Sequence, residues 1–285
     1  MALKIWIDGK FYDQENARIS VYDHGLLYGD GVFEGIRVYR GKIFECDSHL
    51  HRLFDSARGI RLTPPRTPQQ LKAAMEETVK INNFSDCYIR LVITRGTGYL
   101  GLNPNKCLTP TVIIIADIIE LYPPEIYDKG MALITSSVMR MHANSLSPRI
   151  KSLNYLNNIL AKIEAVDAGV PEALMLNQEG NVAECTADNI FIVRGGQVQT
   201  PTTSDGILEG VTRQVMIELC RQLSIPCVEK TLQRHDLYVA DECFLTGTAA
   251  EVVPVTRIDG RAIGNGTPGP ITRRLIEAFH KHVRG

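Results

Sequence analysis

Two adjacent prolines near the middle of the chain limit its possible folds more than any other feature. The segment at 121–125 reads LYPPE, and successive prolines make a chain stiff and extended, because neither a helix nor a strand continues through them. A chain of 285 residues is long enough for two domains. We therefore expect a small domain over 1–120, a linker over 121–133 and a larger domain over 134–285.

Strand and helix patterns occur on both sides of this linker. Before it, alternating apolar residues and turn signals predict strands or hairpins at 4–7, 35–39, 42–45, 87–94 and 111–116. Apolar stripes predict helices at 47–59, with Ser48 as N-cap, and at 68–82. After the linker we expect strands at 131–136, 173–177, 189–193, 226–230 and 242–245, with helices at 154–168, 210–223 and from 270 onward. The pattern indicates an α+β fold.

Charge and cysteine content exclude several classes of protein. The formal net charge of -1 gives no sign of a nucleic-acid or membrane-surface partner. No signal peptide or membrane span is expected. Seven cysteines are scattered without a C-x-x-C pair, so the sequence predicts reduced thiols, a cytoplasmic location and no metal site.

The first candidate for chemistry is a lysine before a predicted helix. Lys151 is followed by Asn154, Tyr155, Asn157 and Asn158, an unusual number of hydrogen-bonding side chains. Most lysines are solvated surface charges. A lysine amine held among polar groups can instead form an imine with an aldehyde, provided that its lone pair is exposed.

The second candidate is a carboxylate in an apolar setting. Glu184 follows Ala183 and precedes a predicted strand, and the Gly180-Asn181 turn before it would suit an ordinary hairpin. A buried carboxylate needs a partner, and a protonated pyridine nitrogen is one that it could hold.

Two short segments could bind an anion. Leu208-Glu209-Gly210-Val211-Thr212-Arg213 begins a predicted helix, where backbone N–H groups and a hydroxyl point outward. An ordinary helix start is the commoner explanation. The turn at 246–251 could add donors, including those of Thr248 and Ala249.

Six segments, in this order, carry a resemblance to a known family: YGDGVFEGIRVY at 28–39, HLHRLFDSARGI at 49–60, KSLNYLNN at 151–158, ALMLNQEGNVAECTADNIFIV at 173–193, LEGVTR at 208–213 and FLTGTAAEVVPV at 244–255. They resemble the fold-type IV enzymes that depend on pyridoxal 5′-phosphate, and within these the branched-chain amino acid aminotransferases. The resemblance implies a two-domain fold like that of D-amino acid aminotransferase. Such a fold has a small α/β N-terminal domain and a larger pseudo-barrel α/β C-terminal domain. A homodimer or higher homo-oligomer is also implied.

The resemblance implies roles for individual residues. Lys151 is similar to the imine-forming lysine, which also moves the substrate's Cα proton, and Glu184 is similar to the carboxylate beside the pyridine nitrogen. The other implied cofactor-binding residues are Arg52, Tyr155, Leu208, Gly210, Val211, Thr212 and Thr248. Resemblance alone supplies Arg52 and Tyr155.

The implied substrates are branched-chain L-amino acids and 2-oxo acids. Tyr88-Ile89-Arg90 resembles the Tyr-x-Arg that serves the distal carboxylate of glutamate, although Arg90 could also be an ion-paired strand residue. A pocket for both an aliphatic side chain and a carboxylate should carry its arginine at the edge. The implied substrate-binding residues are Tyr28, Phe33, Gly35, Arg37, Tyr88, Arg90, Thr248 and Ala249. We therefore expect leucine, isoleucine and valine to be transaminated with 2-oxoglutarate.

Other functions remain open at this point. The D-amino acid aminotransferases carry an Arg-x-His pair after Thr-Arg-Gly-Thr, whereas 94–103 here reads TRGTGYLGLN without a histidine. Aminodeoxychorismate lyase would not need Arg37 and the Tyr-x-Arg pair together. A mixed-specificity transaminase is conceivable, because 121–150 matches no motif. A non-catalytic phosphate-binding module would leave Lys151 and Glu184 unexplained.

Overall fold

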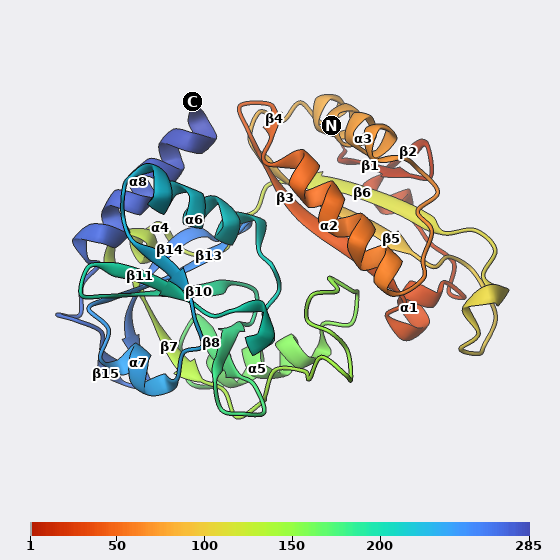
Figure 1. The fold of residues 1–285 in the computed structure, drawn as a ribbon. Helices are drawn as coiled ribbons and strands as arrows, with labels where there is room; N and C mark the ends of the chain where they lie inside the picture. The colour runs from red at the N-terminus through yellow and green to blue at the C-terminus, as the bar shows by residue number, and fades with distance from the viewer. Residues whose placement is uncertain (1) are drawn as a thin grey trace. The chain divides into compact units, whose positions relative to one another are not determined.

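The computed structural model describes residues 2–285, and the chain forms two compact units (Figure 1). The first consists of Met1–Ile119 together with Ile150–Asn154, and the second of Glu120–Arg149 together with Tyr155–Gly285. We propose that the first unit is the small domain and the second unit the large domain expected from the sequence.

The first unit is built on an antiparallel six-stranded sheet with the order β2-β1-β6-β5-β3-β4. Its strands are β1 (Lys4–Ile7), β2 (Lys10–Asp13), β3 (Gly31–Tyr39), β4 (Lys42–Ile43), β5 (Cys87–Thr94) and β6 (Thr111–Asp117). Its helices are α1 (His24–Tyr28), α2 (Cys46–Gly59) and α3 (Pro68–Ile81), with short 3-10 turns at Gln14–Asn16 and Pro104–Lys106.

Helices α2 and α3 pack on one face of this sheet (Figure 1). On β5, Ile89, Leu91 and Ile93 are fully buried and join the same core as Leu53 of α2 and Met75 of α3. Because side chains alternate along a strand, the residues between them point to the opposite face of the sheet. That opposite face is where several of the predicted site residues lie.

The second unit contains a mixed sheet with the order β12-β11-β10-β13-β14-β7-β8-β9, and β15 pairs with β14. Its strands are β7 (Met131–Thr135), β8 (Glu172–Leu176), β9 (Val182–Cys185), β10 (Asn189–Arg194), β11 (Gln197–Thr200), β12 (Cys227–Glu229), β13 (Glu242–Gly247), β14 (Glu251–Ile258) and β15 (Arg261–Ala262). Its helices are α4 (Pro124–Lys129), α5 (Leu156–Asp167), α6 (Val211–Gln222), α7 (Arg234–Tyr238) and α8 (Pro270–Arg284), with a 3-10 turn at Thr203–Asp205.

This sheet curves back on itself. Strand β9 ends the strand order, yet a tight turn leads from it directly into β10, and the Cys185 amide donates to the Asp188 carbonyl at 2.8 Å. The curvature therefore brings β9 beside β10, as the expected pseudo-barrel requires. Helices α6 and α8 pack against each other and against β13 (Figure 1).

The helices differ from the sequence expectation in three places: α2 and α5 begin at other residues, and the expected linker contains a helix. Helix α2 begins at Cys46 with Glu45 as its N-cap, so Ser48 lies inside the helix and donates to the Glu45 carboxylate at 3.2 Å. The expected extended linker contains α4, because Pro124 occupies the first turn of a helix, where its missing N–H costs nothing. Helix α5 begins at Leu156, two residues later than expected.

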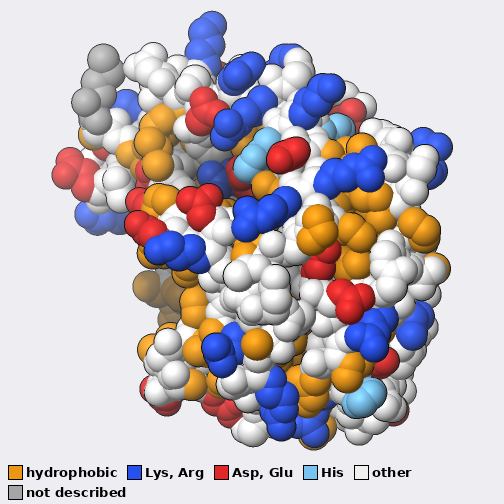
Figure 2. Space-filling view, turned by 90° about the vertical axis from the view of Figure 1, so that its left-hand side faces the viewer, with side chains coloured by type: hydrophobic (Ala, Val, Ile, Leu, Met, Phe, Trp, Pro, Cys, Tyr) orange, Lys and Arg blue, Asp and Glu red, His pale blue; other side chains and the backbone are white. Residues whose placement is uncertain are grey.

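The molecular surface carries charges of both signs. On the face shown in Figure 2, lysine and arginine side chains are interspersed with aspartate and glutamate, consistent with a net charge of -1. No helix within residues 2–285 is long and apolar enough to cross a membrane.

Candidate active site

Five predicted substrate-binding residues lie on the face of the first sheet that α2 and α3 do not cover. On β3 these are Phe33, Gly35 and Arg37, and on β5 they are Tyr88 and Arg90. Gly35 pairs with Arg90 and Arg37 pairs with Tyr88 in the antiparallel register. Residues that pair directly across two antiparallel strands point to the same face, so the register places all five together.

The Phe33 ring lies close to two cations. The Arg90 guanidinium carbon is 4.6 Å from the ring centroid, and the Lys151 ammonium nitrogen is 4.7 Å from it. The Tyr88 ring centroid is 5.5 Å from the same guanidinium. Cations are attracted to the faces of aromatic rings at these distances. An apolar ring thus stands beside both the proposed reactive amine and a group able to bind a carboxylate.

Backbone hydrogen bonds fix Lys151 at the edge of β3. The Phe33 amide donates to the Lys151 carbonyl at 3.0 Å, and the Leu153 amide donates to the Gly31 carbonyl at 2.9 Å. The Lys151 amide donates to the Ser56 hydroxyl of α2 at 3.1 Å. The reactive lysine expected from the sequence therefore extends the first sheet, although it lies 112 positions after Tyr39, where β3 ends (151 − 39).

Gly35 leaves room for the Tyr88 ring. A Cβ atom at Gly35 would lie 1.8 Å from the Tyr88 hydroxyl oxygen and 2.6 Å from Cζ. No other residue type has so little bulk at this position. Gly35 therefore allows Tyr88 to lie flat across β3.

A buried carboxylate ties β3 to α2 beneath this face. Glu34 is fully buried and accepts two hydrogen bonds from Arg52, at 2.8 and 2.7 Å, and one from His49 Nδ1 at 2.8 Å. Burial by itself raises the pKa of Glu34, but Arg52 and His49 outweigh burial and lower that pKa far below its ordinary value. Burial lowers the pKa of His49, and Lys151 adds to that lowering. Arg52 is thus held in one orientation by Glu34.

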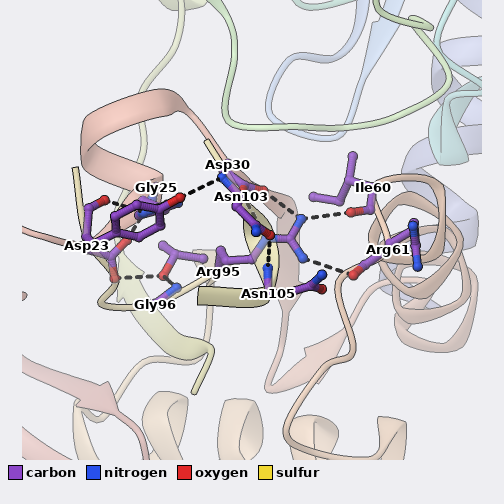
Figure 3. Close-up of polar contacts among 12 residues, drawn as sticks. Asp23, Gly25, Asp30, Ile60, Arg61, Arg95, Gly96, Asn103 and Asn105 are labelled. Carbon is purple, nitrogen blue, oxygen red and sulfur yellow. Dashed lines mark hydrogen bonds and ion pairs between the residues drawn. The ribbon is translucent and has the colours of Figure 1, made fainter. Parts of the chain in front are cut away.

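Asp23 and its partners fix the start of α1, the helix that ends at Tyr28 (Figure 3). Asp23 caps α1 by accepting from the Gly25 amide at 2.7 Å and from the Thr94 hydroxyl at 2.8 Å. The His24 ring packs edge-on against the Tyr28 ring, with centroids 5.0 Å apart.

Arg95 anchors the chain just after Tyr28. Its guanidinium makes two hydrogen bonds of 2.8 Å to the Asp30 carboxylate and donates to the carbonyls of Ile60 at 2.7 Å and Arg61 at 2.9 Å (Figure 3). The chain on both sides of Tyr28 is therefore fixed. Asp30 lies in the 28–39 segment, and neither Asp30 nor Arg95 is among the site residues that the sequence predicts.

In the second unit, Glu184 of β9 lies at the centre of a buried polar network. Its Oε1 accepts from Arg140 Nη2 at 2.6 Å, and its Oε2 accepts from Asn189 Nδ2 at 3.1 Å and the Leu208 amide at 3.0 Å. The side chains of Glu184 and Arg140 are each 6% exposed. The partner that a buried carboxylate requires is thus an arginine, with further donors from β10 and from the loop before α6.

The start of α6 lies beside a second small-residue turn. Gly210 is the N-cap of α6, without a capping side chain, and the Thr212 hydroxyl lies 3.4 Å from that of Thr248. A Cβ atom at Gly210 would lie 2.0 Å from Asn189 Oδ1. Thr248 and Ala249 form the turn between β13 and β14. A helix N-terminus with two hydroxyls has the donors that a phosphate group needs.

Two further carboxylates share the surroundings of Glu184. Burial, together with the neighbouring charges of Glu172 and Glu184, raises the pKa of Asp188 to about 7. Glu172 accepts from the Thr186 hydroxyl at 2.6 Å and ion-pairs with Lys162 at 3.5 Å. A buried region with three carboxylates needs compensating positive charge.

Comparison with known proteins identifies the family. Residues 31–258 match the family described as amino-transferase class IV. A protein of Methanocaldococcus jannaschii described as a putative branched-chain-amino-acid aminotransferase is 51% identical over 282 residues, which cover 99% of this chain and 96% of that protein. The chain belongs to the class IV aminotransferases.

Solved structures of class IV aminotransferases share the fold. The branched-chain amino acid aminotransferase of Escherichia coli is 35% identical, with a TM-score of 0.97, over 100% of this chain and 96% of that chain. The enzyme of the same name from Thermobaculum terrenum, solved in its PLP-bound holo form, is 33% identical, with a TM-score of 0.89, over 99% and 94% of the two chains. The fold class expected from the sequence is confirmed.

The predicted site residues of this class IV aminotransferase fall into two groups. The first unit contains Lys151, Arg52 and the residues Tyr28, Phe33, Gly35, Arg37, Tyr88 and Arg90. The second contains Tyr155, which is the N-cap of α5, and the residues Glu184, Leu208, Gly210, Val211, Thr212, Thr248 and Ala249. Sequence reasoning missed Glu34, Asn189 and Arg140. The first two lie inside recognised motifs, whereas Arg140 lies in 121–150, which offered no motif.

Proposed function

We propose that this class IV aminotransferase moves the amino group of L-leucine, L-isoleucine and L-valine to 2-oxoglutarate, with pyridoxal 5′-phosphate as cofactor. The observation that carries the proposal is the face of the first sheet on which Phe33 lies 4.6 Å from Arg90 and 4.7 Å from Lys151. Full-length similarity to proteins described as branched-chain amino acid aminotransferases supports the choice of substrate.

Each unit carries residues whose chemistry suits one part of the cofactor. Pyridoxal 5′-phosphate supplies an aldehyde that captures an amino group and a ring that withdraws electron density. Lys151 Nζ would bond to the aldehyde carbon, and Glu184 would pair with the ring nitrogen. The N-terminus of α6, with Thr212 and Thr248, would bind the phosphate, and Arg52 would add a positive charge to it.

Lys151 would also transfer the proton that the reaction moves. Lys151 Nζ would accept the proton from the substrate's Cα and would then donate a proton to the carbon of the cofactor's aldehyde group. The contacts of the lysine backbone to Phe33 and Ser56 hold this amine in place during the transfer. Tyr155 would lie at the cofactor's phenolic oxygen, as the family resemblance implies.

Arg90 would allow one pocket to accept two kinds of side chain. The Phe33 and Tyr88 rings give an aliphatic side chain an apolar contact surface, and Arg90 beside them can form an ion pair with the distal carboxylate of glutamate or 2-oxoglutarate. Tyr28, Gly35, Arg37 and Ala249 complete the proposed substrate-binding set.

The proposal extends to assembly and location. Helix α5 exposes a stripe of apolar side chains at helical spacing, which a second copy of the chain would cover in a homodimer or higher homo-oligomer; these are Leu156, Ile159, Leu160, Ile163 and Val166. None of the seven cysteines forms a disulfide within residues 2–285, in keeping with a proposed cytoplasmic location.

Borohydride trapping tests the assignment of Lys151. The yellow protein reconstituted with pyridoxal 5′-phosphate is reduced, digested and analysed by mass spectrometry, with Lys80→Ala, which alters an exposed lysine of α3, as the control variant. We expect the phosphopyridoxyl group on the peptide containing Lys151 in the wild type and in the control. Lys151→Ala should still bind the cofactor but lose roughly 10³-fold or more in turnover. A reduced adduct on a different lysine, or near wild-type turnover by Lys151→Ala, would contradict the assignment.

A further inference from the structure

A buried arginine outside the six segments that carry the family resemblance contacts Glu184. Arg140 lies in the loop after β7, is 5% exposed, and places Nη2 2.6 Å from Glu184 Oε1. Its Nη1 donates to Asn158 Oδ1 at 2.9 Å, and Asn158 in turn donates to the Thr186 carbonyl at 2.6 Å. The guanidinium is therefore held by α5 as well as by β9.

The backbone of Arg140 is also held by hydrogen bonds. Its amide donates to the Leu176 carbonyl at 2.8 Å, and its carbonyl accepts from Gln178 Nε2 at 3.0 Å. The cation thus has little freedom to leave Glu184. A fixed geometry is what an ion pair needs in order to offset the cost of burying two charges.

Arg140 brings a full positive charge to Glu184. Asp188 and Glu172 lie in the same buried region, where Lys162 forms an ion pair with Glu172. Asn189 and the Leu208 amide donate to Glu184 without bringing a full charge. Without a cation beside it, a buried carboxylate near other carboxylates takes up a proton in preference to remaining charged.

We propose that Arg140 is a positioning residue that keeps Glu184 ionised, so that the proton between Glu184 and the cofactor's pyridine nitrogen remains on the nitrogen. This inference rests on the proposed function. A protonated ring withdraws electrons from the substrate more strongly than a neutral ring does. Arg140 would thereby affect the rate of the Cα proton transfer without touching cofactor or substrate.

Nitrogen NMR of the bound cofactor measures the protonation state directly. Holoenzyme is prepared with pyridoxal 5′-phosphate labelled with ¹⁵N in the ring, and the chemical shift distinguishes a pyridinium from a neutral pyridine. The variants are Arg140→Met, which removes the charge, and Arg140→Lys, which keeps it. Arg221→Met is the matched control, because Arg221 is an exposed arginine paired with Glu218 in the same unit.

We expect a pyridinium shift in the wild type, Arg140→Lys and Arg221→Met, and a neutral-pyridine shift in Arg140→Met. The first half-reaction of Arg140→Met with L-leucine should slow roughly 100-fold. If Arg140→Met does not fold, Arg140→Gln replaces it, because glutamine retains a hydrogen-bond donor to Glu184. Since glutamine carries no charge, we expect the same neutral-pyridine shift.

Two other results have distinct meanings. A pyridinium shift in the uncharged Arg140 variants, even with weaker cofactor binding, would overturn the inference and leave the proposed function intact. A wild-type protein that takes up no labelled cofactor would overturn the proposed function, and this inference with it.

Discussion

The Phe33 ring lies beside two positively charged side chains of the first unit. Its ring has a negative face that attracts Arg90 and Lys151, and both cations lie within 5 Å of the ring centroid. Such contacts restrict long, flexible side chains that would otherwise sample many rotamers. One aromatic ring therefore orients both the proposed reactive amine and the proposed carboxylate ligand.

Replacing Arg90 separates the two kinds of substrate. In Arg90→Ala, we expect kcat/KM for 2-oxoglutarate to fall roughly 100-fold, because a charge-assisted hydrogen bond contributes about 1.5–3 kcal/mol. The kcat/KM for L-leucine should change less than about fivefold, because the leucine side chain makes no ion pair with Arg90. Arg58→Ala, an exposed arginine of α2, is the control. Equal losses for both substrates would show that Arg90 does not discriminate between them.

Gly35 is predicted to be intolerant of a single methyl group. In Gly35→Ala, the added Cβ would lie 1.8 Å from the Tyr88 hydroxyl oxygen, so Tyr88 must move and the KM for branched-chain substrates should rise about tenfold or more. The double variant Gly35→Ala/Tyr88→Ala removes the clash and should bind substrate no worse than Tyr88→Ala alone. Steady-state kinetics on the three variants form a double-mutant cycle. Additive effects would argue against the clash.

Single site residues were predictable from the sequence where the signal lay in the residues next to them. Hydrogen-bonding residues follow Lys151 in the sequence, and Glu184 lies in an apolar stretch; in the structure Lys151 is half-buried and Glu184 is buried. Arg140 was not predictable, because its partner Glu184 lies 44 positions later (184 − 140) and no local pattern links them. The pairing depends on a sheet that joins β7, β8 and β9.

At the scale of elements, the loop before α6 joins two parts of the proposed cofactor site. Glu184 accepts from the Leu208 amide at 3.0 Å, and Asn189 donates to both Glu184 and the Leu208 carbonyl, at 3.1 and 3.0 Å. The carboxylate proposed for the ring nitrogen and the helix end proposed for the phosphate are therefore braced against each other. This bracing fixes the spacing between the two groups before any cofactor binds.

The hydroxyl at the start of α6 should contribute to cofactor affinity. In Thr212→Val the shape is kept but one donor to the phosphate is lost, so the dissociation constant of pyridoxal 5′-phosphate should rise roughly 10–100-fold. Thr212→Ser retains the hydroxyl and is the matched control. Absorbance titration of the apoenzyme measures both. Equal affinities of the valine and serine variants would exclude Thr212 from the phosphate site.

Regular elements were predictable where one side of the element is buried. Strand β5 alternates buried and half-buried residues over most of its length, and helix α3 begins with a capping box formed by Thr67 and Gln70. Helix starts were less predictable. Glu45 caps α2 from a left-handed conformation with φ 44°, which no residue preference foretells, because tertiary contacts impose it.

At the scale of the whole molecule, the proposed chemistry depends on segments that are distant in the sequence. Residues Ile150–Asn154 belong to the first unit, whereas the residues on both sides of them belong to the second. Lys151 is therefore placed by β3 and α2 and not by the elements next to it in the chain. Sequence patterns identify the lysine, but they do not show that residues 150–154 belong to the first unit while the residues on both sides belong to the second.

The buried Glu34 network predicts a dependence of stability on pH. The folded-state pKa of Glu34 lies below its ordinary value of 4.5, so the unfolded chain binds the proton more readily. This contribution is fully present above about pH 4.5 and is lost as the pH falls below it. The lowered pKa of His49 acts in the same direction, starting from its ordinary value of 6.5.

Urea unfolding between pH 3.5 and 7 checks this expectation in the wild type and in Glu34→Gln. The variant should be less stable at pH 7, because Arg52 loses its buried partner, and its stability should change less with pH below about 4.5. Glu77→Gln, which alters an exposed carboxylate of α3, should keep the wild-type dependence. A variant curve parallel to that of the wild type would contradict the role of Glu34.

The amino-acid specificity of the first half-reaction tests the central claim most directly. The yellow holoenzyme is mixed in separate cuvettes with L-leucine, L-isoleucine, L-valine, L-glutamate, D-alanine and D-glutamate, and conversion to the pyridoxamine form is followed by absorbance. We expect rapid bleaching by the four L-amino acids and none by the D-amino acids. Bleaching mainly by D-alanine or D-glutamate would leave Lys151 and Glu184 in their proposed roles but contradict the branched-chain assignment.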